Sequence, residues 1–305
     1  MFGSLSRIQL AIIALIFANI IWGAAFPIYK WTLEIVPPFI FTFIRFFGGA
    51  LIVLPFVYKS LRIQRSDIPK LILVSLIGIS VQIPLLFFGL KLSPSINAPI
   101  IIASAPIILI ISSVIFLNEK LKVKVLIGTL VSLLGVLAII LRPFIESGGL
   151  TGSVLGNFLL FGATVCSVAQ ALILKRITAN NDPLALVFWM FVIGIIPIIP
   201  FALYETQTFN LLTQINLQAV IGLLYGIVFA AVIAHYLYAF GIKFVKASEV
   251  GIFSYVDPLA TIVIAIPLLG EIITPTYILG AILVFLGIFI AEGRVHYHPF
   301  QRLRT

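Results

Sequence analysis

Ten long apolar runs limit what this chain can fold into. Charged residues, prolines and polar clusters separate the runs, and most of them reach the roughly 20 residues that a helix needs to cross a bilayer. The sequence therefore predicts an all-α integral membrane protein with ten transmembrane helices. The expected spans are 8–30, 38–58, 68–91, 97–117, 123–142, 153–174, 184–204, 217–241, 249–269 and 275–292.

The composition excludes most other classes of protein. Hydrophobic residues make up 62% of the 305 residues and charged residues only 10%, against about 25% charged in an average soluble domain. Such a chain has too few charges to cover a soluble surface and too many apolar residues to be disordered. Its single cysteine, Cys166, excludes a disulfide framework.

Most basic residues lie on one side of the predicted spans. Fifteen Lys and Arg fall on the side of the N-terminus and three, Lys30, Lys91 and Arg142, on the other. By the positive-inside rule, we expect both termini of this multi-pass membrane protein in the cytoplasm. The same rule explains the net charge of +9 without nucleic acid as a partner.

The two halves of the chain repeat each other. The matched positions include Lys30 with Lys175 and Pro38 with Pro183 at a shift of 145 residues, and Pro106 with Pro258 and Glu119 with Glu271 at a shift of 152. Two repeats of five spans, 8–142 and 153–292, are predicted, followed by a cytoplasmic tail at 293–305. Because five is odd, the second repeat enters the membrane from the opposite side, as in many secondary transporters.

Short motifs occur in a definite order along the chain. They are Trp22-Gly23 with Lys30, Arg45, Pro106 with Leu117-Asn118-Glu119-Lys120-Leu121, Pro258 with Leu269-Gly270-Glu271, and glycines in the fifth and tenth spans. In this order they resemble the drug/metabolite transporter superfamily, and within it the ten-span family with two EamA domains. The resemblance covers about 10–292 and implies an inner-membrane metabolite carrier, commonly an exporter, of unspecified substrate. One departure is Cys166-Ser167-Val168, where the first repeat has Trp22-Gly23.

Two ionisable side chains lie deep inside predicted spans, where a functional role is the first hypothesis for a charge. Asp257, near the middle of the ninth span, is predicted to bind a cationic group or to carry a proton. Arg45, in the second span, is predicted to bind a substrate carboxylate. Pro258 is expected to kink the ninth span and free the carbonyl of Ser254. A structural ion pair or the wall of a water-filled cavity is the alternative.

Further candidates for substrate contact are one histidine, several amides and several aromatic residues. His235 is a candidate proton relay with Asp257, with packing as its alternative. The amides of Asn19 and Gln82 rank above that of Gln170, and helix-to-helix hydrogen bonds are their alternative. The candidates for an aromatic wall, with packing or lipid contact as the alternative, are Trp22, Tyr236 and Tyr255.

Other residues are predicted to have structural roles. Glu119 and Glu271 lie at helix ends, where a carboxylate can accept hydrogen bonds from the first amides of the next helix, and gating is the alternative role. Small residues seven apart share one helix face and permit close packing, with a dimer seam as a further option. These residues are Gly128, Gly135, Gly280 and Gly287.

The sequence favours a secondary transporter. It contains no phosphate loop, dinucleotide fingerprint, zinc-protease motif or nucleophile elbow, and neither a metal nor a cofactor is predicted. The expected partners are a small, amino-acid-like metabolite or drug, the lipid bilayer, a proton as a coupling option, and a second copy of the chain as a dimer option. The competing functions are an intramembrane enzyme using His235 with Asp257, and a non-catalytic membrane subunit or channel.

Overall fold

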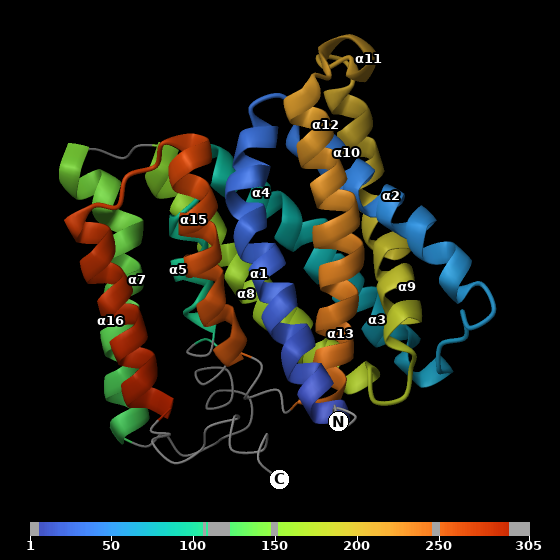
Figure 1. Ribbon diagram of the computed structural model, residues 1–305, viewed down its shortest axis with the longest axis horizontal. Coiled ribbons are helices and arrows are strands. Elements are labelled where there is room, and N and C mark those ends of the chain that lie inside the picture. The colour runs from blue at the N-terminus through green and yellow to red at the C-terminus, as the bar shows by residue number, and fades with distance from the viewer. Residues whose placement is uncertain (1–5, 106–107, 109–122, 148–151, 246–250, 293–305) are drawn as a thin grey trace, which may run out of the picture.

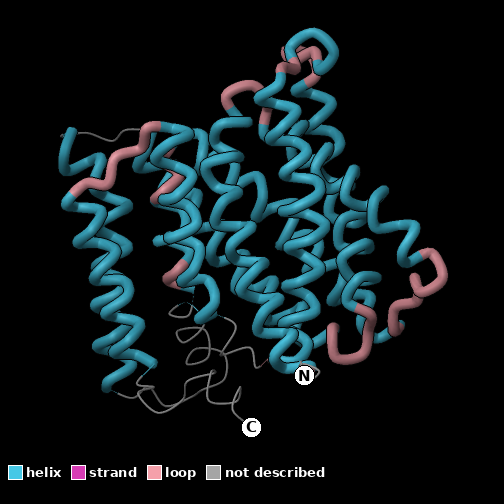
Figure 2. Tube along the Cα trace, in the orientation of Figure 1, coloured by secondary structure: helices cyan, strands magenta, loops and turns pink. Residues whose placement is uncertain are grey.

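The computed structural model describes residues 6–105, 108, 123–147, 152–245 and 251–292. Within these ranges every regular element is a helix (Figure 2). In chain order they are α1 (Arg7–Leu33), α2 (Pro38–Val57), η1 (Arg65–Asp67), α3 (Ile68–Ser75), η2 (Leu76–Val81), α4 (Gln82–Leu92), α5 (Asn97–Ile102), α7 (Val123–Ser147), α8 (Gly152–Ile177), α9 (Pro183–Ile195), η3 (Ile196–Ile198), α10 (Ile199–Glu205), α11 (Leu211–Gln214), α12 (Leu217–Leu224), η4 (Tyr225–Ile233), α13 (Ala234–Phe244), η5 (Gly251–Val256), α15 (Asp257–Leu269) and α16 (Pro275–Glu292).

Six helical segments are long and apolar enough to cross a membrane. They are Arg7–Leu33, Pro38–Val57, Arg65–Leu92, Ser153–Ile177, Pro183–Glu205 and Leu217–Phe244. Three shorter apolar helices cover Leu126–Arg142, Phe253–Leu269 and Pro275–Ile290. The protein is therefore a helical, multi-pass membrane protein. Most of the predicted span 97–117, Glu119 and the predicted tail lie outside the described residues.

Local sequence explains where several helices begin and end. Ser6 caps α1: its side chain accepts from the amide of Gln9, and the side chain of Gln9 accepts from the amide of Ser6. Asp182 caps α9 by accepting from the amides of two residues in its first turn. Gly270 ends α15 with φ of 63°, a left-handed conformation that favours glycine.

Two of the long segments contain a stretch of π-helix. η2 separates α3 from α4, and η4 separates α12 from α13. The shift of 152 residues places Val81 on Ile233, and these are the last residues of the two π-helices. Short π-helical stretches inside α-helices occur frequently at functional sites, so these two mark where to look for one.

The helices next to the centre of the molecule form two packed groups. Bundle A consists of α1 with α12, η4, α13 and α15, and bundle B consists of α8 with α3, η2, α4 and α5. The repeat registers relate these groups, since α1 corresponds to α8, α13 to α4, and α15 to the span that begins with α5. α2 packs against α9.

α7 and α16 lie side by side at one edge of the molecule (Figure 1). A Cβ atom added at Gly135 would lie 2.6 Å from the carbonyl oxygen of Gly280, and one added at Gly287 would lie 2.5 Å from that of Gly128. The backbones of the two helices can approach this closely only because these residues lack side chains. The four glycines are therefore occupied by packing within the chain, and a homodimer stays a prediction.

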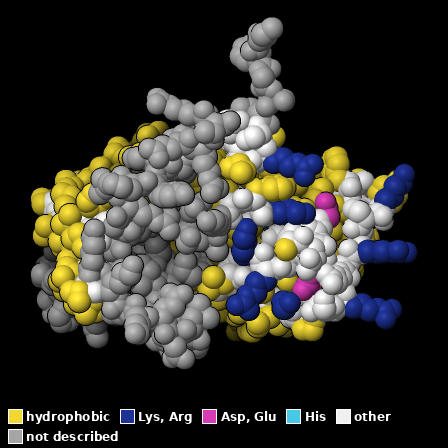
Figure 3. Space-filling view, turned by 90° about the horizontal axis from the view of Figure 1, so that it is seen from below, with side chains coloured by type: hydrophobic (Ala, Val, Ile, Leu, Met, Phe, Trp, Pro, Cys, Tyr) yellow, Lys and Arg dark blue, Asp and Glu magenta, His cyan; other side chains and the backbone are white. Residues whose placement is uncertain are grey.

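Lys and Arg gather on the described part of the face where α1 begins, with few acidic residues among them (Figure 3). Exposed basic residues beside helix ends include Lys59, Arg62, Arg65, Lys70 and Arg176. The positive-inside rule associates such a face with the cytoplasm. The orientation in the membrane stays a prediction, and we call the opposite end of the molecule the outer end.

Candidate functional site

A cavity of about 200 Å³ lies between the two bundles. Its lining comes mainly from α1, α2, η2, α4, α5, α8, α9 and α13, and from the junction of η5 with α15. The predicted site residues that line it are Asn19, Trp22, Arg45, Gln82, Gln170, His235 and Asp257. Tyr236 and Tyr255 are not among the lining residues: Tyr236 is exposed, and the ring of Tyr255 meets that of Phe285 at 5.5 Å.

Among the described residues, Arg45 is the largest side chain to be fully enclosed, with 2% of its surface exposed. Its Nη2 donates to the carbonyl oxygen of Ala230 over 3.3 Å. The guanidinium carbon lies 4.9 Å from the ring centre of Tyr29 and 4.7 Å from that of Phe46, which are cation–π distances. Its Nε and Nη1 have no hydrogen-bond partner, so the guanidinium retains donors for a ligand.

The carbonyl oxygen of Ala230, in the π-helix η4, connects three side chains. Trp22 Nε1 donates to it over 3.1 Å, Arg45 Nη2 over 3.3 Å, and His235 Nδ1 lies 2.9 Å away. Because a carbonyl can only accept, the proton belongs on Nδ1, and Nε2 of a neutral imidazole is then an acceptor. This backbone atom holds the three side chains in fixed relation to one another.

Asp257 lies at the first residue of α15, directly after the 3₁₀-helix η5. The predicted kinked helix is therefore wrong in detail: the span changes helix type and begins anew at Asp257. The reason is that Pro258 has no amide hydrogen, so it suits the first turn of a helix and not its interior. Asp257 is 3% exposed, and its Oδ1 has no hydrogen-bond partner.

Arg45 and Asp257 do not neutralise each other. Within the described residues the ion pairs join Lys30 to Glu271 and Lys70 to Asp67. The cavity thus presents a guanidinium group and a carboxyl group that do not pair with each other, which differs from the structural ion pair that was the alternative. In the described part of the chain no three His, Cys, Asp or Glu side chains gather as a metal site would require.

The three candidate amides differ in what they can offer a ligand. Asn19 Nδ2 donates to the carbonyl of Leu15 in its own helix over 2.7 Å, so one of its two N–H donors is occupied. Gln82 Oε1 is buried without a hydrogen-bond partner. Gln170 lies against Gly78 in η2, so closely that a Cβ at Gly78 would collide with its side-chain amide. Of the three, Gln82 thus has a buried oxygen open to a ligand, and the roles of Asn19 and Gln170 stay predictions.

Sequence reasoning missed three aromatic residues of the lining, Phe26, Tyr29 and Tyr238. Tyr29 follows Trp22 by seven residues on the same face of α1, and this spacing could have revealed it. Tyr238 packs its ring against Trp22 at 5.1 Å. The Ala230 carbonyl was also missed, because sequence does not distinguish one backbone carbonyl from another.

Many lining residues occur in pairs related by the two repeat registers. In these pairs the chemistry differs between the halves. The pairs are Arg45 with Met190, Tyr29 with Leu174, Trp22 with Ser167, Ala25 with Gln170, Ile83 with His235, Leu86 with Tyr238, and Ala105 with Asp257. Each charged residue thus has an uncharged counterpart that lines the same cavity.

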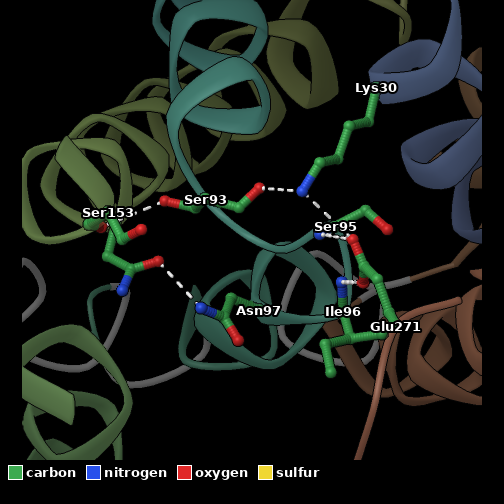
Figure 4. Close-up of polar contacts among 8 residues, drawn as sticks. Lys30, Ser93, Ser95, Ile96, Asn97, Ser153 and Glu271 are labelled. Carbon is green, nitrogen blue, oxygen red and sulfur yellow. Dashed lines mark hydrogen bonds and ion pairs between the residues drawn. The ribbon is translucent and has the colours of Figure 1, made fainter. Parts of the chain in front are cut away.

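A polar cluster lies at the outer end of the molecule, and Figure 4 shows its contacts. Glu271 accepts hydrogen bonds from the amides of Ser95 and Ile96, just before α5, and pairs with Lys30. The prediction that Glu271 accepts from the first amides of the next helix, α16, is therefore wrong. Its carboxylate accepts from amides just before α5 instead. Glu271 lies beside α5 in space, although 175 residues separate it from Ile96.

The family model described as EamA-like transporter family matches this chain at 9–141 and again at 154–292. The chain belongs to the EamA-like transporter family. The resemblance stated from the sequence motifs is confirmed. Membership makes the protein a membrane transporter, and a small molecule and the lipid bilayer are accordingly its partners.

Other members of the EamA-like transporter family give the same picture. Two relatives from Bacillus subtilis (strain 168), the uncharacterized transporters YetK and YyaM, are each 26% identical to this chain. The alignment with YetK covers 92% of this chain and 86% of YetK, and that with YyaM covers 90% and 91%. An uncharacterized transporter of Archaeoglobus fulgidus (strain ATCC 49558 / DSM 4304 / JCM 9628 / NBRC 100126 / VC-16) is also 26% identical, over 94% of this chain and 85% of its own.

A solved crystal structure shares the fold of this EamA-like transporter. The TM-score is 0.65 at 17% sequence identity, and the match covers 96% of this chain and 99% of the other. At this identity the likeness concerns the fold alone.

Proposed function

We propose that this transporter is a secondary carrier that moves a small zwitterionic, amino-acid-like metabolite by alternating access, outward across the inner membrane. One observation carries the proposal. Arg45 and Asp257 line the same cavity with opposite charges, and neither charge is neutralised by the other.

The substrate class follows from the groups that each charge leaves open. Arg45 Nε and Nη1 have no hydrogen-bond partner, and either can donate a charge-assisted hydrogen bond to a carboxylate. The free carboxylate oxygen of Asp257 suits an ammonium group. An uncompensated buried charge is costly. A ligand that carries both a positive and a negative charge therefore stabilises Arg45 and Asp257 at once. The rings of Trp22, Tyr29 and Tyr238 favour a ligand with an apolar part.

The duplication supports alternating access through an inverted repeat. The family model matches twice along the chain, the repeat registers relate bundle A to bundle B, and paired positions line the cavity. Two related groups around a central site are the arrangement with which inverted-repeat carriers expose one site to each side in turn. The same five-span repeats underlie the proposed ten spans.

Coupling to protons is part of the proposal, with Asp257 and His235 as the candidate carriers. The two do not form a direct hydrogen bond, since His235 Nδ1 faces Ala230. This arrangement favours separate roles over the acid–base couple that an intramembrane enzyme would use.

Counterflow in proteoliposomes tests the proposal. Liposomes loaded with one unlabelled amino acid should accumulate its labelled form, across a panel of apolar and polar amino acids. The matched controls are the same molecules without the carboxylate and without the amino group. We expect each control to exchange at least about tenfold more slowly, because one buried charge stays uncompensated. Equal exchange of all three forms, or of none, would contradict the proposed substrate class.

The proposed orientation has its own test. A reporter enzyme that is active only in the periplasm, attached after Thr305, should stay inactive, since the 15 to 3 distribution of basic residues predicts a cytoplasmic C-terminus. Strong reporter activity would overturn the arrangement of ten spans with both termini inside.

A further inference from the structure

The junction between α4 and α5, residues 93–96, is held by two side chains of bundle A. Lys30 Nζ donates to the carbonyl oxygen of Ser93 over 2.7 Å. Glu271 accepts from the amide of Ser95 over 2.6 Å and from that of Ile96 over 2.9 Å. Lys30 and Glu271 also pair with each other at 3.2 Å (Figure 4). All three backbone groups belong to bundle B.

The charges of this pair match the polarity of the two helix ends. Ser93 follows the last residue of α4, where carbonyl oxygens are left without helical partners and a cation is favourable. Ser95 and Ile96 precede α5, where amide groups are left without partners and an anion is favourable. The lysine beside the carbonyl oxygens and the glutamate beside the amides are therefore both stabilising. If the two residues were exchanged, each charge would face a helix end of its own sign.

A related contact occurs at the other end of the molecule. Lys175 of bundle B donates to the carbonyls of Ile242 and Val245 in bundle A, over 2.6 and 2.7 Å. The repeat registers place Lys30 on Lys175 and Ser93 on Val245. Each bundle therefore uses one lysine to hold the end of a helix in the other bundle, at opposite ends of the central cavity.

We propose that the Lys30–Glu271 pair is a latch that closes the outer end of the cavity, and that transport requires its contacts with residues 93–96 to break. The inference rests on the proposed alternating access. A cavity between two bundles opens at one end only when contacts between the bundles break at that end. The side chains of Lys30 and Glu271 are only 25% and 9% exposed, so opening brings water to charges that the closed form shields.

Contacts inside bundle B explain why the junction can move as a unit. Asn97 Nδ2 donates to Asn157 Oδ1 over 3.0 Å, and Ser93 Oγ donates to the carbonyl of Ser153 over 3.1 Å. Both bonds join the junction to α8 of the same bundle. Release of the latch therefore leaves residues 93–97 attached to α8.

A buried reporter thiol measures opening without any substrate. Ser95 is 0% exposed, and Ser95→Cys keeps the amide that Glu271 accepts from. With Cys166→Ser as background, the purified protein in nanodiscs is labelled with a hydrophilic maleimide. Glu271→Gln and Lys30→Met should each raise the labelling rate about tenfold, because charge-assisted hydrogen bonds between the bundles are lost. Lys91→Met, an exposed lysine at the same end, is the matched control and should leave the rate unchanged.

A charge swap separates a latch from an ordinary ion pair. Lys30→Glu with Glu271→Lys keeps the pair but puts each charge on the wrong helix end, so labelling should stay fast. A return to the rate of the parent protein would overturn the proposal, as would unchanged labelling in both single variants. Because this assay needs no substrate, its result is independent of whether zwitterions are transported.

Cross-linking provides a second measurement that retains the folded protein. Ser95→Cys with Glu271→Cys, joined by a cleavable reagent that links two thiols, should stop counterflow, and reductive cleavage should restore it. Transport at the full rate while the link is intact would contradict the latch.

Discussion

The two halves of the chain contribute to the cavity at related positions but with different chemistry. In the first half, Arg45 brings a positive charge, while its counterpart Met190 is apolar. In the second half, Asp257 brings a negative charge, while its counterpart Ala105 has no polar side chain. The difference teaches that related positions place side chains around one cavity, whereas the residue types at those positions determine its chemistry. A residue that matters for substrate should therefore not tolerate the residue of its counterpart.

The largest effect is expected at Arg45. Arg45→Met introduces the residue of the counterpart, removes the donors for a carboxylate and leaves Asp257 as the only charge of the pair. Transport of the zwitterionic substrate should fall about 100-fold. Arg45→Lys keeps the charge but loses the planar fork, so a loss of about tenfold is expected. Normal counterflow by Arg45→Lys, together with misfolding of Arg45→Met, would assign Arg45 a structural role.

Asp257→Asn should have the next largest effect. The amide has nearly the same shape and removes the negative charge, so the variant should insert and run as one species in gel filtration. We expect counterflow to fall about 30-fold, since an ammonium group loses its charged partner. Uptake measured with and without a pH gradient shows whether the carboxyl also carries a proton. If the rate and the pH response equal those of the parent protein, Asp257 has no part in transport.

Sequence predicted the helical membrane fold and singled out the two charged residues of the cavity lining, because apolar length and intramembrane charge are local properties. Helix starts at proline, such as Pro38 and Pro183, were predicted to within a residue. The π-helices and the role of the Ala230 carbonyl were not, since the same side chains suit both helix types and backbone groups carry no sequence signal. The partner of Glu271 was missed for a different reason, because it depends on how distant segments pack.

Gly78 provides a test of the difference between the two halves at a position that has no side chain. The registers align Gly78 with Ala230, and Gln170 with Ala25. Gly78→Ala should push the Gln170 side chain into the cavity and lower the counterflow rate about tenfold, the usual scale of overpacking. Adding Gln170→Ala removes the collision and should restore part of the rate. A double variant slower than Gly78→Ala alone would show that η2 itself, and not Gln170, responds to the added methyl group.

The smallest effect is expected at Asn19, where the two halves agree. Asn19 Nδ2 donates to the carbonyl of Leu15, and Thr164, its counterpart, donates in the same way to the carbonyl of Leu160 over 2.9 Å. In both helices the side chain bonds to the residue four positions before it, so Asn19→Thr keeps the donor bond. We expect counterflow within about twofold of the parent protein, the range of a substitution that breaks no specific interaction. Asn19→Leu, which cannot donate, serves as the comparison. A tenfold loss in Asn19→Thr, with the protein still monodisperse, would mean that the Asn19 amide contacts substrate, and the two halves would then differ even where their hydrogen bonds are alike.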